Sequence, residues 1–140
     1  MNMKLFFAFT IMLAAASGAS TVTYVDHDKV AASLAKSAPL VTAPDYLVSG
    51  SHRTGPGEVE VHDKETDVMY VVDGSATLVT GGTMVGGKTT APGQSRGTEI
   101  KGGETHHLSK GDVIVVPAGT PHWFKEVPAS ISYYVVKVVK

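Results

Sequence analysis

Two groups of residues in this chain carry side chains that bind divalent metal ions or transfer protons. The first group contains Glu60, His62 and Asp67, and the second contains His122. Imidazole and carboxylate groups are ligands that Fe(II), Mn(II) and Zn(II) accept in proteins. Glu60 and His62 are two residues apart, so on a β-strand their side chains point to the same face. These residue types therefore indicate a candidate metal-binding or acid–base site, if the fold brings the two groups together.

The spacing around these residues follows two patterns. Residues 111–122 read G-x5-P-x-G-x2-H, and residues 60–74 read E-x-H-x4-D-x6-G. Together they resemble the two-part signature of the cupin superfamily, in which His and Glu are usual where Glu60 and Asp67 stand here. The resemblance extends over about the whole chain after residue 19. It implies an all-β fold, a double-stranded β-helix or jelly-roll barrel, preceded here by a short N-terminal helix.

The resemblance also implies a ligand set, because cupins hold a divalent metal ion inside the barrel through these positions. The implied ligands are Glu60, His62, Asp67 and His122, and the implied ion is Fe, Mn or Zn. Asp67 is one methylene shorter than Glu, so a role in orienting a histidine is the alternative to direct coordination. Burying two carboxylates without a cation costs free energy, which favours metal binding over a barrel that has lost its metal.

Other residues near the motifs are candidates for a ligand pocket. Met69 and Phe124 share the strand faces of the implied ligands, and His52 lies on the strand before Glu60. Glu126 is a candidate catalytic base four residues after His122, and a solvated carboxylate is the alternative.

We assign no catalytic or metal-binding role to three further basic residues. Lys137 interrupts an apolar strand, and we expect its ammonium group on the outer, solvated face; an ammonium group inside the barrel is the alternative. His106 and His107 are adjacent, so they point to opposite faces, and we expect surface or hydrogen-bonded core histidines.

Local patterns place these residues on elements. We expect a helix over residues 26–37, capped by Asp28 and followed by Pro39. Residues 81–103 carry eight glycines and few large apolar groups, which predicts a long mobile excursion, either a lid at the barrel mouth or a plain surface hairpin. From residue 46 onward the pattern is of short strands separated by glycine-rich turns such as Asp73-Gly74. The expected strands are 46–52, 57–62, 67–72, 76–80, 98–100, 105–108, 113–116, 122–127 and 131–139.

The N-terminal residues are typical of an export signal. Lys4 precedes an apolar run over residues 5–16, and the small residues 16–19 offer a cleavage site. Cleavage would leave residues 20–140 as one cupin barrel domain, secreted or periplasmic and free of the membrane; an uncleaved anchor is the alternative. The chain has no cysteine, so it depends on no disulfide. Its 12 basic and 13 acidic residues are not clustered, which argues against nucleic acid as a partner.

Two function classes remain open at this stage. The first is a metal-dependent cupin enzyme acting on a small molecule, of the oxygenase, isomerase or lyase type. The second is a cupin that binds a sugar or an organic acid without converting it. A structural barrel would follow if the inward face were entirely apolar. Tyr70 and Val72 lie on the face opposite Asp67, which suggests a homodimer through the outer sheet.

Overall fold

The structure is a computed structural model that describes residues 21–140. The expected export signal at residues 1–19 lies outside the described residues. Within residues 21–140, no helix is of the length and apolar character needed to span a bilayer.

The described residues form a helix, α1 (His27–Lys36), and twelve strands. The strands are β1 (Pro39–Thr42), β2 (Tyr46–Arg53), β3 (Val59–His62), β4 (Glu65–Thr80), β5 (Thr83–Val85), β6 (Lys88–Ala91), β7 (Gln94–Gly97), β8 (Glu99–Lys101), β9 (Glu104–Ser109), β10 (Val113–Val116), β11 (His122–Glu126) and β12 (Ile131–Val139).

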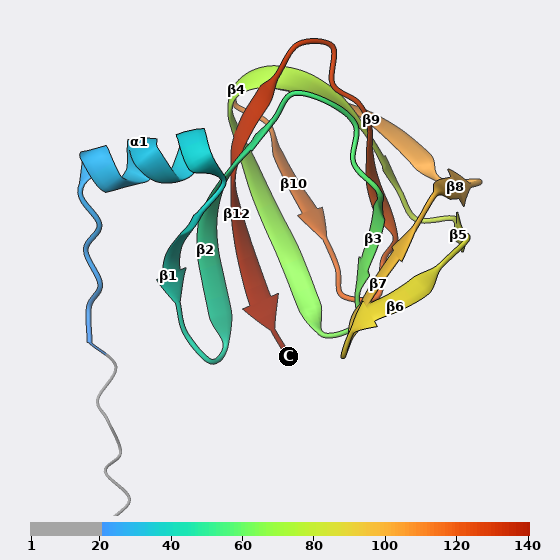
Figure 1. Ribbon diagram of the computed structural model, residues 1–140, viewed down its shortest axis with the longest axis horizontal. Coiled ribbons are helices and arrows are strands. Elements are labelled where there is room, and N and C mark those ends of the chain that lie inside the picture. Colours follow the sequence, from blue (N-terminus) through green and yellow to red (C-terminus); the bar gives the residue numbers. More distant parts are fainter. Residues whose placement is uncertain (1–20) are drawn as a thin grey trace, which may run out of the picture.

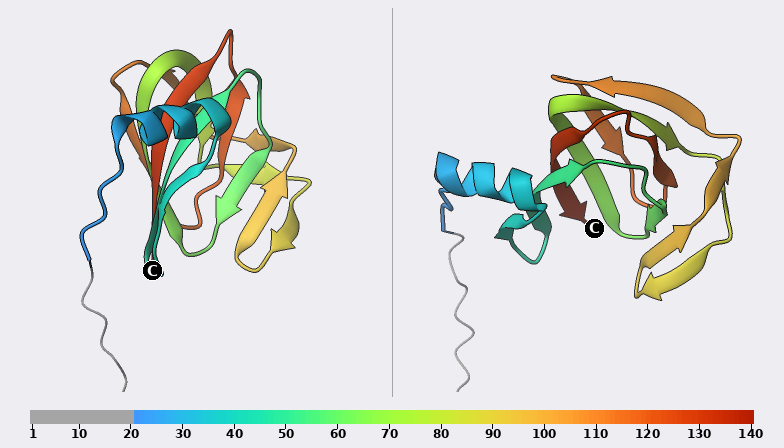
Figure 2. Two further views of the ribbon diagram at one scale, coloured as in Figure 1. Left: turned by 60° about the vertical axis from the view of Figure 1, so that its left-hand side comes forward. Right: turned by 45° about the horizontal axis from the view of Figure 1, so that its top comes forward.

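Two facing sheets curl toward each other and enclose the barrel interior (Figure 1, Figure 2). The first half of β4 pairs with β10 and β12, and β12 pairs with β2, which pairs with β1. The second half of β4 pairs with β9 and β11, and β11 continues through β3 and β7 to β6. All of these pairs are antiparallel. This is the jelly-roll barrel that the sequence predicts.

The long strand β4 joins the two sheets because it bends at its middle. The sequence predicts two strands separated by an Asp73-Gly74 turn, whereas the structure has one strand that continues through the bend. Gly74 has φ +78°, and a Cβ at this position would lie 2.0 Å from the carbonyl oxygen of Ser130. Glycine therefore permits both the backbone conformation and the close approach of the neighbouring chain.

Helix α1 lies outside the barrel against β2 (Figure 1). Its N-cap is Asp26, which accepts a hydrogen bond from the backbone N–H of Lys29; Asp28, the cap predicted from sequence, lies in the first turn instead. At Gly50 the strand approaches the helix so closely that a Cβ would lie 2.6 Å from the backbone nitrogen of Leu34.

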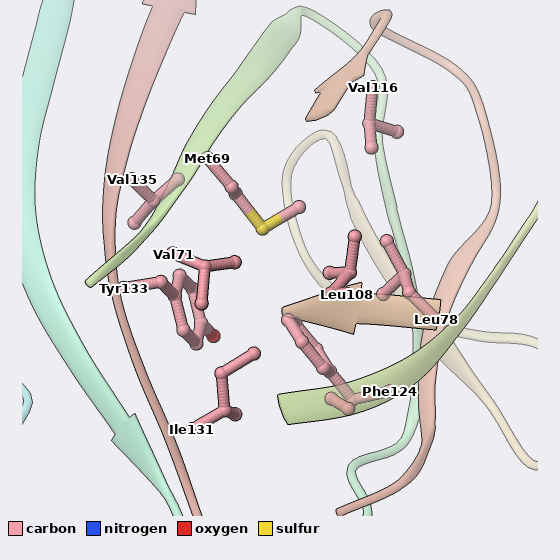
Figure 3. Close-up of a cluster of buried hydrophobic side chains, with 10 residues drawn as sticks. Met69, Val71, Leu78, Leu108, Val116, Phe124, Ile131, Tyr133 and Val135 are labelled. Atoms are coloured by element: carbon pink, nitrogen blue, oxygen red, sulfur yellow. The ribbon is translucent and has the colours of Figure 1, made fainter. Parts of the chain in front are cut away.

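The interior of the barrel is divided into an apolar part and a polar part. Inward side chains from both sheets form the apolar core, including Leu78 and Ile131, which are fully buried (Figure 3). Next along the same strand faces come Asp67 on β4, His122 on β11 and Lys137 on β12. A polar layer therefore lies at one end of the apolar core, and the inward face is not entirely apolar.

Residues 81–103 differ from the sequence-based expectation. They form β5 to β8 rather than a lid: β6 and β7 make a hairpin, as one of the two alternatives expected, but this hairpin extends one sheet beside β3, and β5 pairs with β8. Met84 and Ile100 pack with Val59 and Val79 on the outer face of that sheet. The apolar side chains are few, but they cover a buried surface, and all the glycines except Gly97 lie between the strands. The segment is therefore part of the barrel wall.

Candidate functional site

Strand register brings the four implied ligands to one end of the barrel. His122, the first residue of β11, is the cross-strand partner of Glu60 on β3. His62 ends β3, on the same face as Glu60. Asp67, near the start of β4, is the cross-strand partner of Lys137. His62, Asp67 and His122 are buried, with 6%, 4% and 4% of their surface exposed.

The tips of the four side chains converge on one point. Nε2 of His62 lies 3.6 Å from Oε2 of Glu60 and 3.5 Å from Oδ2 of Asp67. Nε2 of His122 lies 3.8 Å and 3.7 Å from the same two oxygens. The residues that the sequence motifs single out are therefore assembled into one site.

Hydrogen bonds at the far side of each imidazole fix which nitrogen faces this point. Nδ1 of His62 donates to Oε1 of Gln94 on β7. Nδ1 of His122 donates to the backbone carbonyl of Thr120, at 3.1 Å. In their neutral forms both rings therefore present the lone pair of Nε2 to the two carboxylates. Nε2 of His62 is buried and has no hydrogen-bond partner among the described residues.

This arrangement fits a divalent metal ion. Each imidazole Nε2 lies 3.5–3.8 Å from the two carboxylate oxygens, which is too long for a hydrogen bond. Ligands about 2.1 Å from a tetrahedral ion lie about 3.4 Å apart, close to these separations. Within the described part of the chain, two groups could hold an ion: Glu60 with His62 and His122, and His62 with Glu65 and Asp67.

Each carboxylate of the site also has a cationic partner within the protein. Nη1 of Arg96 on β7 lies 2.6 Å from Oε1 of Glu60. Nζ of Lys137 lies 2.8 Å and 2.9 Å from the two oxygens of Asp67. The expectation that Lys137 points to solvent is therefore wrong. The argument that both acids would be unpaired without a metal ion also fails, and the case for an ion rests on the two imidazoles and their geometry.

The ion pairs shift the pKa values of the site in opposite directions. Burial disfavours the charged form of His62, but contact with Asp67 outweighs burial and raises the pKa of His62 above its usual value. Burial likewise disfavours the Asp67 carboxylate, yet His62 and Lys137 together hold its pKa below the ordinary range. Burial lowers the pKa of His122, which keeps that imidazole neutral.

The other sequence candidates contribute none of the converging atoms. Met69 and Phe124 share the inward face, but both are buried in the apolar core. His52 is exposed on the outer side of β2, where its Nδ1 contacts the hydroxyl of Ser132, so it does not line the site. Glu126 is exposed because a bulge after Phe124 breaks the alternation on β11, so it does not share the inward face of His122.

Residues outside the two motifs complete the site, and sequence reasoning missed them. Gln94 and Arg96 come from β7, inside the segment expected to be mobile, and they alternate on one face of that strand. A hollow of about 270 Å³ is lined in part by Gln94 and Glu65, and none of the four converging residues lines it. His106, by contrast, is a hydrogen-bonded histidine as expected: it shares the inward face of β9 with Leu108, and its Nε2 lies 2.9 Å from the hydroxyl of Thr80.

Comparison with known proteins identifies the family. The family model described as Cupin matches residues 46–137. The chain is a cupin. The match includes all four converging residues and both motifs.

Solved structures agree with this assignment at the level of the fold. This cupin is similar to a Klebsiella pneumoniae protein with a double-stranded β-helix domain (TM-score 0.50, 18% identity, covering 72% of this chain and 73% of that one). It is also similar to the cupin domain of Schizosaccharomyces pombe Cnp3 (TM-score 0.53, 14% identity, covering 74% and 59%). No curated protein matches the sequence. At these identities the likeness establishes the fold and leaves the chemistry to the residues of this chain.

Proposed function

We propose that this cupin binds a divalent transition metal ion through Glu60, His62 and His122, and acts as an enzyme on a small molecule. The observation that carries the proposal is the pair of imidazoles whose Nδ1 atoms are held by Gln94 and Thr120, so that both Nε2 lone pairs face one carboxylate oxygen. Two imidazoles and one carboxylate with further open positions suit Fe(II), and also Mn(II) or Zn(II).

The residues of the site supply what such an enzyme needs. Gln94 and Thr120 hold the imidazoles in one tautomer, and the adjoining apolar core limits access of water from that side. When bound, the ion would polarise a substrate oxygen or bind dioxygen, which fits an oxygenase, isomerase or lyase. The hollow lined by Glu65 and Gln94, of which Gln94 contacts His62, supports approach of a small molecule from that end of the barrel.

Metal analysis tests the first half of the proposal. Protein purified without a metal-affinity resin should take up about one equivalent of Mn(II), Fe(II) or Zn(II), and His62→Ala and His122→Ala should each abolish uptake. His52→Ala is the matched control, because His52 is an exposed histidine on the outer side of β2. Uptake below a tenth of an equivalent for all three ions would count against the metal centre.

A non-catalytic cupin that binds a sugar or an organic acid is the second candidate. It is supported by the ion pairs of Glu60 with Arg96 and of Asp67 with Lys137, which balance both acids without an ion. Turnover that requires Fe(II) and dioxygen would favour an oxygenase. Stabilisation by a ligand, with no product formed in the presence of any of the three metals, would favour binding alone.

We also propose that the barrel forms a homodimer through the outer face of the sheet that contains β10. Tyr70, Val113 and Val115 are 46%, 61% and 54% exposed there, and Tyr70 is the cross-strand partner of Val113. A cluster of exposed apolar side chains of this kind supports contact with a second copy. Sedimentation at micromolar concentration should give a dimer that Val113→Lys disrupts and Val22→Lys does not. A monomeric wild-type protein would refute this.

We propose that residues 1–19 direct export and are removed. The support is the basic start, apolar run and small residues of the sequence itself. Sequencing the N-terminus of protein recovered from the exported fraction should give residue 20 first, and an intact Met1 there would contradict cleavage.

A further inference from the structure

Lys137 is the one charged residue of β12, and it points into the barrel. It follows Tyr133 and Val135 on the inward face of the strand, and its side chain is only 19% exposed. Its Nζ lies 2.8 Å and 2.9 Å from the two oxygens of Asp67, and 3.4 Å from Oε2 of Glu65. A single ammonium group therefore contacts two of the acids at this end of the barrel.

This contact distinguishes the two groups of residues that could hold a metal ion. The group of His62, Glu65 and Asp67 already has a cation, because both of its carboxylates contact Lys137. The group of Glu60, His62 and His122 differs, since Arg96 contacts only Oε1 of Glu60, and Oε2 faces the two imidazoles.

We propose that Lys137 is a resident counter-cation of the site. It commits Asp67 to an ion pair, so that Asp67 does not coordinate the ion, and the ligand set is reduced to Glu60, His62 and His122. The part of this inference that concerns metal binding rests on the proposed function. The ion pair between Lys137 and Asp67 does not.

Two consequences follow from the charges. In the metal-free protein, removal of the ammonium leaves the buried Asp67 carboxylate without its partner, which destabilises the fold. In the presence of a divalent ion, the same removal takes away a neighbouring positive charge and frees Asp67 as an additional ligand. Lys137→Met should therefore make the protein less stable when empty and tighter in metal binding.

The experiment combines thermal unfolding of the metal-free protein with titration of Mn(II), on wild type, Lys137→Met, Asp67→Asn and the double variant. We expect Lys137→Met to lower the Tm by on the order of 10 °C, and Asp67→Asn to restore part of that loss in the double variant. We expect Mn(II) affinity to rise at least tenfold in Lys137→Met, to return toward the wild-type value in the double variant, and to fall in Asp67→Asn by less than it falls in Glu60→Gln. Lys125→Met is the matched control, because Lys125 is an exposed lysine beside Trp123; both measurements should stay at the wild-type values.

The outcomes separate this inference from the proposed function. Wild-type binding that is not strengthened in Lys137→Met refutes the counter-cation role and leaves the metal centre standing. Binding that is absent in wild type but present in Lys137→Met refutes the metal centre of the natural protein and supports the role of Lys137. A loss of affinity in Asp67→Asn as large as that in Glu60→Gln, or an unchanged Tm in Lys137→Met, also overturns the inference.

Discussion

Gln94 offers a sharp test of how the barrel wall supports the candidate metal centre. Its Oε1 accepts the hydrogen bond from Nδ1 of His62, and it lies on β7 as the cross-strand partner of that histidine. Gln94→Leu keeps a side chain of similar size and removes the acceptor. His62 then loses the contact that fixes its tautomer and its ring orientation, while Glu60 and His122 keep theirs.

The expected magnitude follows from the contacts of Nδ1. Loss of a hydrogen-bond partner behind a metal-binding histidine typically costs 10- to 100-fold in metal affinity, or about 1.4–2.8 kcal/mol. Oε2 of Glu65 lies 3.8 Å from the same Nδ1, so a small movement supplies a substitute acceptor. We therefore expect a loss near tenfold. The metal-free protein should lose about 1 kcal/mol of unfolding free energy, or about 4 °C in Tm.

The assay is calorimetric titration of Mn(II), together with thermal unfolding without metal. Gln94→Glu is the conservative variant, because it keeps an acceptor oxygen, and its affinity should equal or exceed that of wild type. Ser95→Ala is the control on the same strand, since Ser95 points to the opposite face. If Gln94→Leu bound Mn(II) as tightly as wild type, the view that β7 orients His62 would be wrong.

Three further predictions concern packing and pH. Gly50→Ala should destabilise the protein by about 1–3 kcal/mol in urea unfolding, because a Cβ at residue 50 would contact the backbone of α1. Gly55→Ala is the control and should cost little, because no atom lies within 4 Å of a Cβ there. Equal losses of stability in the two variants would contradict the packing of α1 on β2. Leu78→Ala, in the fully buried core, should cost about 2–5 kcal/mol, and Val22→Ala, at 98% exposure, about 0.5 kcal/mol or less; comparable losses would contradict the core assignment. Because the pKa of His62 is raised in the folded protein, metal-free wild type should be more stable than His62→Gln at low pH. This difference in unfolding free energy should be fully present below pH 6.5 and should shrink as the pH rises through the raised pKa of His62. A difference that grows above pH 6.5 would contradict the direction of the pKa shift.

Much of the architecture follows from local pattern in the sequence. The strands Val113–Val116 and Ile131–Val139 have the bounds that apolar runs and flanking turns predict. The shared face of Glu60 and His62 follows from the alternation of side chains along a strand, which needs no knowledge of the partner strands. The two motifs fix the family for the same reason, since their residues lie close together in the sequence.

Other features depended on contacts between distant strands. Glu126 does not lie on the inward face because β11 has a bulge where it pairs with β4. A bulge depends on the pairing of two strands, so the residues of β11 alone do not predict it. Residues 81–103 became part of the wall because β7 pairs with β3, although their own composition is poor in apolar side chains.

The sequence by itself determined the family of the chain and the strands that hold the four converging side chains. Only the tertiary structure decided what surrounds those side chains. Lys137 lies 70 residues from Asp67, and Gln94 lies 32 residues from His62, so strand register alone makes them neighbours. Charge balance and hydrogen bonding act over a few ångströms in space, and separation along the chain does not reveal them.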